Sequence, residues 1–139
     1  MNTTPITCQL VSDSQRLSHT EKLFGLAFPL AIEPAIYTFA DHLAEDYQGG
    51  YWHFYTLSNG GFYMAPMADK PFQISCDNGY EGQLSADAFG IICCLYAYSH
   101  LSFSNKPATL SPLCTKQFHW LRDYALDHAE SGAILEAID

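Results

Sequence analysis

The clearest alternation of side chains lies in residues 51–57, between two Gly-Gly pairs at 49–50 and 60–61. A strand points successive side chains to opposite faces, and both faces of this segment carry large or aromatic groups, so we expect cover on both sides. Residues 58–61 favour a tight reversal, and the extended pattern resumes over 62–65. The sequence therefore predicts a β-hairpin at the centre of the fold.

Four further segments have the apolar spacing of helices. A short helix is predicted over 15–26, with Pro29 preventing its extension, and a second begins at Glu33 and runs to about residue 47. A third, capped by Ser85, is apolar nearly all round over 89–103 and belongs in the middle of the molecule. The last opens at Ser111-Pro112 and is expected to end near Gly132, a residue suited to a left-handed cap.

Residues 72–76 alternate cleanly and precede the turn residues 77–79, which predicts a third strand. Together these elements predict an α+β fold, in which a small antiparallel sheet with a central hairpin packs against about four helices, one of them largely buried. The chain has 139 residues and 48% hydrophobic content, which suits a single domain over residues 1–139.

The hairpin segment 47–66 (YQGGYWHFYTLSNGGFYMAP) carries a family resemblance, together with residues 24–47 (FGLAFPLAIEPAIYTFADHLAEDY) and 85–90 (SADAFG). These segments resemble the ArdB/KlcA family of antirestriction proteins, small proteins carried on plasmids and other mobile elements. The resemblance covers nearly the whole chain. It implies protection of incoming unmodified DNA from type I restriction-modification enzymes.

The formal charge of −9 is concentrated in two acidic regions. No Lys or Arg lies between Lys22 and Lys70, and none follows Arg122. Such a surface would repel free DNA, because non-specific binding depends on Lys and Arg replacing counterions along the phosphates. We therefore expect a protein partner, either a type I restriction-modification enzyme or an associated host factor, and no direct binding of nucleic acid.

Two groups of carboxylates are candidate contact residues for that partner. Asp41 and Glu45 stand four residues apart on the outer side of the second predicted helix, while Asp123, Asp127 and Glu130 align on the outer face of the last one. Such stripes can be solvated helix faces that keep an acidic protein soluble. They can also dock on basic residues of a partner.

The aromatic candidates are Tyr51, His53, Tyr55 and Tyr63, which would form a patch if they are exposed on one sheet face. Tyrosine suits protein interfaces because it buries a large area with little loss of entropy. The alternative is ordinary packing, with the tyrosines half-buried on the sheet. The strand register decides between these interpretations, and both stay open at the level of sequence.

Five cysteines without a secretory signal indicate reduced thiols, and no apolar run reaches the roughly 18 residues of a membrane span, so a cytoplasmic protein is expected. No paired Cys or His spacing typical of zinc ligands occurs. We therefore expect no metal and no cofactor.

Two alternatives belong to other functional classes. An acidic DNA mimic would have the right sign of charge, but only 15% of the residues are charged. A small Cys/His hydrolase-like enzyme could use Cys76 and His53, on neighbouring strands, as nucleophile and base. No local motif of a nucleophile or a phosphate-binding loop supports an enzyme, so none is expected.

Overall fold

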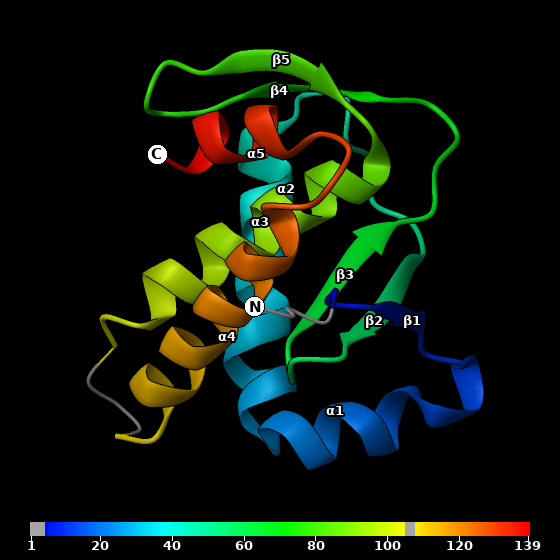
Figure 1. The fold of residues 1–139 in the computed structure, drawn as a ribbon, viewed down its shortest axis with the longest axis vertical. Coiled ribbons are helices and arrows are strands. Elements are labelled where there is room, and N and C mark those ends of the chain that lie inside the picture. Colours follow the sequence, from blue (N-terminus) through cyan, green and yellow to red (C-terminus); the bar gives the residue numbers. More distant parts are fainter. Residues whose placement is uncertain (1–4, 105–107) are drawn as a thin grey trace.

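A computed structural model describes residues 5–104 and 108–139 (Figure 1). In chain order its elements are β1 (Cys8–Leu10), η1 (Asp13–Gln15), α1 (Arg16–Phe24), η2 (Phe28–Ile32), α2 (Glu33–Leu43), β2 (Trp52–Leu57), β3 (Phe62–Pro66), β4 (Phe72–Ser75), β5 (Glu81–Leu84), α3 (Ala86–Leu101), α4 (Leu110–Ala125) and α5 (Ser131–Ile138). The described residues thus contain five α-helices and two small antiparallel sheets, which confirms the α+β class.

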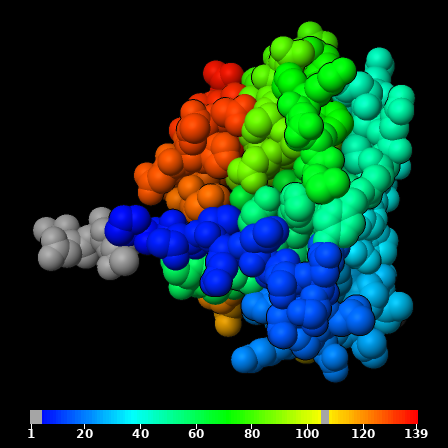
Figure 2. All heavy atoms as spheres, turned by 90° about the vertical axis from the view of Figure 1, so that its right-hand side faces the viewer, coloured from blue at the N-terminus to red at the C-terminus, as the bar shows by residue number. Residues whose placement is uncertain are grey.

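The predicted hairpin is confirmed as β2 and β3, which pair antiparallel with Tyr55 opposite Tyr63. Gly60 adopts a φ of 103° in the reversal, a conformation that favours glycine. The third strand of this sheet is β1, which pairs antiparallel with β2 and lies on the surface next to α1 (Figure 2). The strand predicted over residues 72–76 is confirmed, but it does not join the hairpin sheet. It is β4, which pairs with β5 in a separate sheet at the opposite end of the molecule from α1 (Figure 1).

The predicted buried helix is α3, which packs against β3, α2, α4 and α5. Its cap is the one predicted, since the Ser85 hydroxyl oxygen accepts the Ala88 N–H at 3.1 Å. Residues 89–95 and 97–98 are buried all round the helix, as expected for the apolar segment. The molecule is therefore organised around this helix.

Side chains from α3 and α4 satisfy the free edge of β3. The Phe62 N–H donates to Gln117 Oε1 at 2.9 Å, and the Tyr98 hydroxyl donates to the Phe62 carbonyl at 2.8 Å. The Met64 N–H is 3.4 Å from Cys94 Sγ. An edge strand with unpaired backbone groups can pair with another chain, so these contacts close the edge within the fold.

The chain around Pro29 differs from the prediction. Helix α1 ends at Phe24 because Gly25 takes a φ of 60°, and its N–H bonds back to the Glu21 carbonyl. Pro29 then lies near the start of the π-helical turn η2, where a missing N–H is tolerated, and η2 continues directly into α2. The glycine, and not the proline, separates the helices.

Two predicted helix ends were also wrong. Helix α2 stops at Leu43, because Ala44 is extended and bridges to Ile74. The last predicted helix is two helices, α4 and α5, and Gly132 lies inside α5 instead of ending α4. Over the described residues no single helix is long and apolar enough to cross a membrane. Residues 13–24 and 28–43 reach that length and composition only together, across a bend of 94°.

Candidate functional site

The aromatic side chains of the hairpin form a continuous row on one face of the sheet. The ring centroid of His53 lies 5.6 Å from that of Tyr51 and 6.2 Å from that of Tyr55. Tyr55 stacks on Tyr63 with 4.8 Å between ring centroids. Tyr51 is 43% exposed, and His53 and Tyr55 are half-buried. Tyr63 is only 1% exposed, because Tyr124 of α4 covers its ring. Its placement in an exposed patch was therefore wrong, whereas Tyr51, His53 and Tyr55 can reach solvent.

The Tyr63 hydroxyl is part of a polar network that sequence reasoning missed. It donates to Asp87 Oδ1 at 2.8 Å, and His128 Nε2 lies 2.8 Å from Asp87 Oδ2. The Glu130 N–H donates to His128 Nδ1 at 2.9 Å, so Nδ1 carries no proton and Nε2 donates to Asp87. Both nitrogens of His128 are engaged, so this histidine orients the network and has no lone pair available as a general base.

Glu130 belongs to the same network and not to a free acidic surface. One carboxylate oxygen accepts the Ser85 N–H at 3.0 Å, and the other accepts the Ser85 hydroxyl. Because Ser85 caps α3, Glu130 holds the start of the central helix. The alignment of Glu130 with Asp123 and Asp127 on one helix was wrong, since α4 ends at Ala125.

Asp123 and Asp127 are both exposed, one on the last turns of α4 and the other just beyond its end. Asp41 is exposed on α2, and Glu45 is exposed two residues after that helix ends, so the two do not share one helix face as predicted. Glu45 instead lines a depression together with His42 and Asp77, which form an ion pair at 3.1 Å when the histidine is protonated. These four carboxylates stay candidate contact residues.

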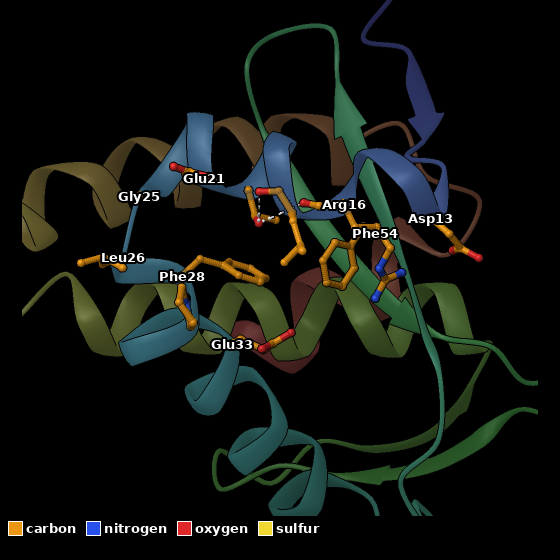
Figure 3. A pocket seen from close by; sticks show the side chains of 11 residues that line it. Asp13, Arg16, Glu21, Gly25, Leu26, Phe28, Glu33 and Phe54 are labelled. Carbon is orange, nitrogen blue, oxygen red and sulfur yellow. Dashed lines mark hydrogen bonds between the residues drawn. The ribbon is translucent and has the colours of Figure 1, made fainter.

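A cleft of about 690 Å³ lies between α1, η2, the start of α2 and β2 (Figure 3). Phe28 and Phe54 lie in it, between Glu21 on α1 and Glu33 on α2. Sequence reasoning missed this cleft because its lining comes from five separate elements, η1, α1, η2, α2 and β2. The available signal was Leu17, an apolar residue on the outer side of the short first helix.

Arg16 closes one end of the cleft and is held in a fixed position. Its guanidinium carbon lies 3.6 Å from the centroid of the Phe54 ring, and Nη1 donates to the Trp52 carbonyl at 2.7 Å and to the Tyr51 hydroxyl at 3.0 Å. The Tyr51 hydroxyl donates in turn to Asp13. That hydrogen bond raises the pKa of Tyr51, so the phenol keeps its proton. Tyr51 thereby links the aromatic row to the cleft.

The Cys76 and His53 pair is not formed. Cys76 follows β4 in the two-stranded sheet and is buried, whereas His53 lies on β2 among the tyrosines. Burial raises the pKa of the Cys76 thiol, which disfavours the thiolate that a nucleophile requires. All five thiols are free, and no three metal-binding side chains converge within residues 5–104 and 108–139.

Comparison with known proteins shows that the chain is an antirestriction-type protein. It belongs to the antirestriction protein family, whose model matches residues 45–139. The chain is 40% identical to Antirestriction protein KlcA of Escherichia coli, over 97% of this chain and 96% of that one. It is 42% identical to the uncharacterized protein YafX of Escherichia coli strain K12, over 96% of this chain and 88% of that one.

The fold also has a solved counterpart. A structure described as KlcA and ArdB proteins with a novel fold superposes with a TM-score of 0.90 at 40% identity and covers 100% of both chains. Those proteins are described as having antirestriction activity against type I DNA restriction systems in vivo but not in vitro. The resemblance inferred from the hairpin and its flanking segments is confirmed.

Proposed function

We propose that this protein blocks type I restriction-modification activity against incoming unmodified DNA, through contact with the restriction enzyme or an associated host factor. The observation that carries the proposal is the 40% identity, along the full chain, to a structure described as antirestriction against type I systems in vivo but not in vitro. Antirestriction activity that is found in cells but not in vitro favours a mechanism that requires a cellular component in addition to the restriction enzyme and its DNA. A host factor fits that requirement.

The charge of the chain supports contact with protein over contact with DNA. The formal net charge is −9, and Asp41, Glu45, Asp123 and Asp127 are all exposed. Carboxylates repel phosphates and attract basic protein surfaces, including those that handle DNA. A DNA mimic would instead need a continuous row of carboxylates, because duplex DNA carries a charge about every 1.7 Å along its axis. Asp41 and Glu45 lie on α2 and just after it, whereas Asp123 and Asp127 lie in the last turn of α4 and just after it.

The proposed function is tested by plating phage on cells with an active type I system, with and without expression of this protein. Unmodified phage should plate several orders of magnitude more efficiently on expressing cells. Phage already modified by the host should plate equally in both cases, which controls for effects on growth. An unchanged efficiency for unmodified phage, with the protein soluble and folded, would contradict the proposal.

Charge reversal tests the acidic contact residues. Asp123→Lys/Asp127→Lys should reduce protection if these carboxylates meet basic groups of the partner. The control Asp69→Lys/Glu136→Lys makes the same change in net charge at exposed positions elsewhere on the molecule. Equal protection by the two folded double variants would remove Asp123 and Asp127 from the contact surface.

The aromatic row is tested in the same assay with Tyr55→Ala. Tyr55 is half-buried and stacks on Tyr63, so its replacement can destabilise the fold. The stability of the variant protein is therefore measured alongside protection. A variant that stays folded and loses protection would support contact through this face. A folded variant that protects fully would assign Tyr55 to packing.

A further inference from the structure

We propose that the cleft beneath α1 is a docking site for a basic amphipathic segment of a protein partner. The cleft lies between α1, η2 and β2, does not include Asp41, Glu45, Asp123 or Asp127, and adjoins the aromatic row through Tyr51. The proposal deepens the proposed function by naming one contact surface. It rests on that function only in taking the partner to be the restriction enzyme or an associated host factor. Binding in the cleft can be measured without any restriction system.

The first observation is the exposure of two leucines that line the cleft. Leu17 on α1 is 85% exposed and Leu26, in the turn after α1, is 75% exposed, and both line the cleft. Phe28 and Phe54 also line the cleft, with only 5% and 4% of their surfaces exposed, and their rings pack edge to face with centroids 5.6 Å apart. Single exposed apolar residues are common, but two leucines exposed along the same cleft make an apolar surface of the kind that partners cover.

The second observation is the charge around this apolar surface. Asp13, Glu21 and Glu33 line the cleft, and among the described residues Arg16 is its one lining cation. The Arg16 guanidinium is already used within the fold, by the Trp52 carbonyl, the Tyr51 hydroxyl and the Phe54 ring. Of the three carboxylates, Asp13 accepts a hydrogen bond from Tyr51 and Glu33 accepts one from Tyr37 at 3.4 Å. No donor among the described residues reaches the Glu21 carboxylate, which is exposed.

The exposed leucines and the acidic walls formed by Asp13, Glu21 and Glu33 together select one kind of occupant. Leu or Phe side chains of the segment would pack against Leu17 and Leu26, and Lys or Arg side chains would pair with Glu21 and reach Asp13 and Glu33. An amphipathic helix presents apolar and basic side chains on adjoining faces at the spacings that a groove recognises. The cleft volume of about 690 Å³ accommodates a few such side chains and no folded domain.

Binding is tested with a fluorescent peptide of leucine and lysine in helical amphipathic order, followed by anisotropy. A peptide of the same composition in scrambled order and one with glutamate in place of lysine serve as controls. The protein should bind the lysine peptide in preference to both. Equal binding of the glutamate peptide would overturn the proposal, because the acidic walls would then select nothing.

The location is tested with Leu17→Ser/Leu26→Ser, which should weaken binding of the lysine peptide by about tenfold or more. Leu30→Ser is the matched control, since Leu30 is 74% exposed on the neighbouring η2 but does not line the cleft. Glu21→Gln should weaken binding and reduce its dependence on salt. Equal affinity in the Leu17→Ser/Leu26→Ser and Leu30→Ser variants would overturn the assignment to the cleft.

Two further measurements separate this proposal from neighbouring ones. In the plating assay, Leu17→Ser/Leu26→Ser should lose protection and Leu30→Ser should keep it. If the parent protein protects and the double variant protects equally, the cleft proposal fails and the proposed function stands. If the parent protein forms dimers that only the double variant abolishes, a second copy of this chain occupies the cleft and the basic partner is excluded.

Discussion

The Tyr63 hydroxyl donates a hydrogen bond to Asp87 Oδ1 across 2.8 Å and so joins the central hairpin to the first turn of α3. The second oxygen of Asp87 receives His128 from the loop between α4 and α5, also at 2.8 Å. One carboxylate therefore ties together three elements that are far apart in the chain. Burial and the nearby Asp87 charge raise the pKa of Tyr63, so it stays a neutral donor across the physiological range.

Removing that hydroxyl should destabilise the protein. Tyr63→Phe keeps the ring stacked on Tyr55 and Tyr124 but deprives Asp87 of a donor. A hydrogen bond to a charged group contributes about 2 kcal/mol, so we expect a loss of that order in the free energy of unfolding measured in urea. Tyr55→Phe is the control, because no hydrogen bond to its hydroxyl occurs within the described residues. It should change stability by less than about 0.5 kcal/mol. Equal losses in the two variants would show that the Asp87 contact contributes nothing.

Glu130 and Asp127 are expected to behave differently, although both are carboxylates near the end of α4. Glu130→Ala leaves the Ser85 N–H and hydroxyl without their acceptor and weakens the start of α3, which should cost about 1.5 kcal/mol. Asp127 is exposed, and its replacement by alanine should change stability by less than about 0.5 kcal/mol. Urea unfolding monitored by circular dichroism distinguishes the two. A larger loss for Asp127→Ala would contradict the structural role assigned to Glu130.

The elements that sequence predicts well are those whose signals are local. The hairpin has alternation and a glycine reversal within one short stretch, and α3 has both a serine cap and an apolar run. The strands missed, β1 and β5, are three and four residues long and mostly exposed. Their pairing partners lie elsewhere in the chain, and a strand of that length carries no periodicity of its own.

Errors in the candidate site have the same cause. Asp123, Asp127 and Glu130 have a helical spacing in sequence, but the chain leaves the helix at Ala125, and Ser85 then binds Glu130. Tyr63 has the same strand pattern as Tyr55, and only the packing of α4 buries one and not the other. The cleft beneath α1 depends on how separate elements meet. Composition and spacing describe a residue's own element, whereas exposure and hydrogen bonding depend on its neighbours in space.

Gly90 allows the close approach of α3 to β3. A Cβ atom at this position would lie 2.4 Å from the Met64 carbonyl oxygen and 2.5 Å from Ala65 Cα. Both are backbone atoms that cannot move aside without displacing the strand. Gly90→Ala should therefore cost roughly 3 kcal/mol, although alanine is the better helix former.

The matched control is Gly132→Ala in α5, where a Cβ would meet nothing within 4 Å. There the change should leave stability unaltered or raise it by up to about 1 kcal/mol. Urea unfolding of both variants gives the comparison. A neutral Gly90→Ala variant would mean that α3 can move away from β3 at little cost.

One thiol should react in the folded protein. Cys8 is exposed, whereas Cys76, Cys93, Cys94 and Cys114 are buried. Burial of its sulfur raises the pKa of Cys8, an effect that hydrogen bonding with the Tyr63 and Tyr124 hydroxyls partly offsets. Titration with a disulfide reagent at neutral pH should therefore modify Cys8 alone, more slowly than free cysteine, and the rate should rise with pH. Cys8→Ser should abolish this reaction, and all five thiols of the parent protein should react in denaturant. Fast modification of a second thiol would contradict the burial of the other four.

His19 should make the stability of the protein depend on pH. It lies on α1 with Nε2 buried and without a hydrogen-bond partner among the described residues. Burial, together with repulsion from Lys22, lowers the pKa of His19. The unfolded chain then binds a proton at this residue before the folded protein does as the pH falls. The stability associated with neutral His19 is complete above the unfolded pKa of about 6.5, and it decreases as the pH falls below that value.

His19→Phe removes this titration while keeping a ring of comparable size. We therefore expect the parent protein to lose more free energy of unfolding than His19→Phe when the pH is lowered from about 7.5 to about 5.5. Carboxylates also titrate toward the lower end of this window, so the quantity to compare is the difference between the two proteins at each pH, measured by urea unfolding. An equal decline in both would show that the folded protein accepts a proton on His19 as readily as the unfolded chain does, and that the buried Nε2 is hydrated or free to turn toward water.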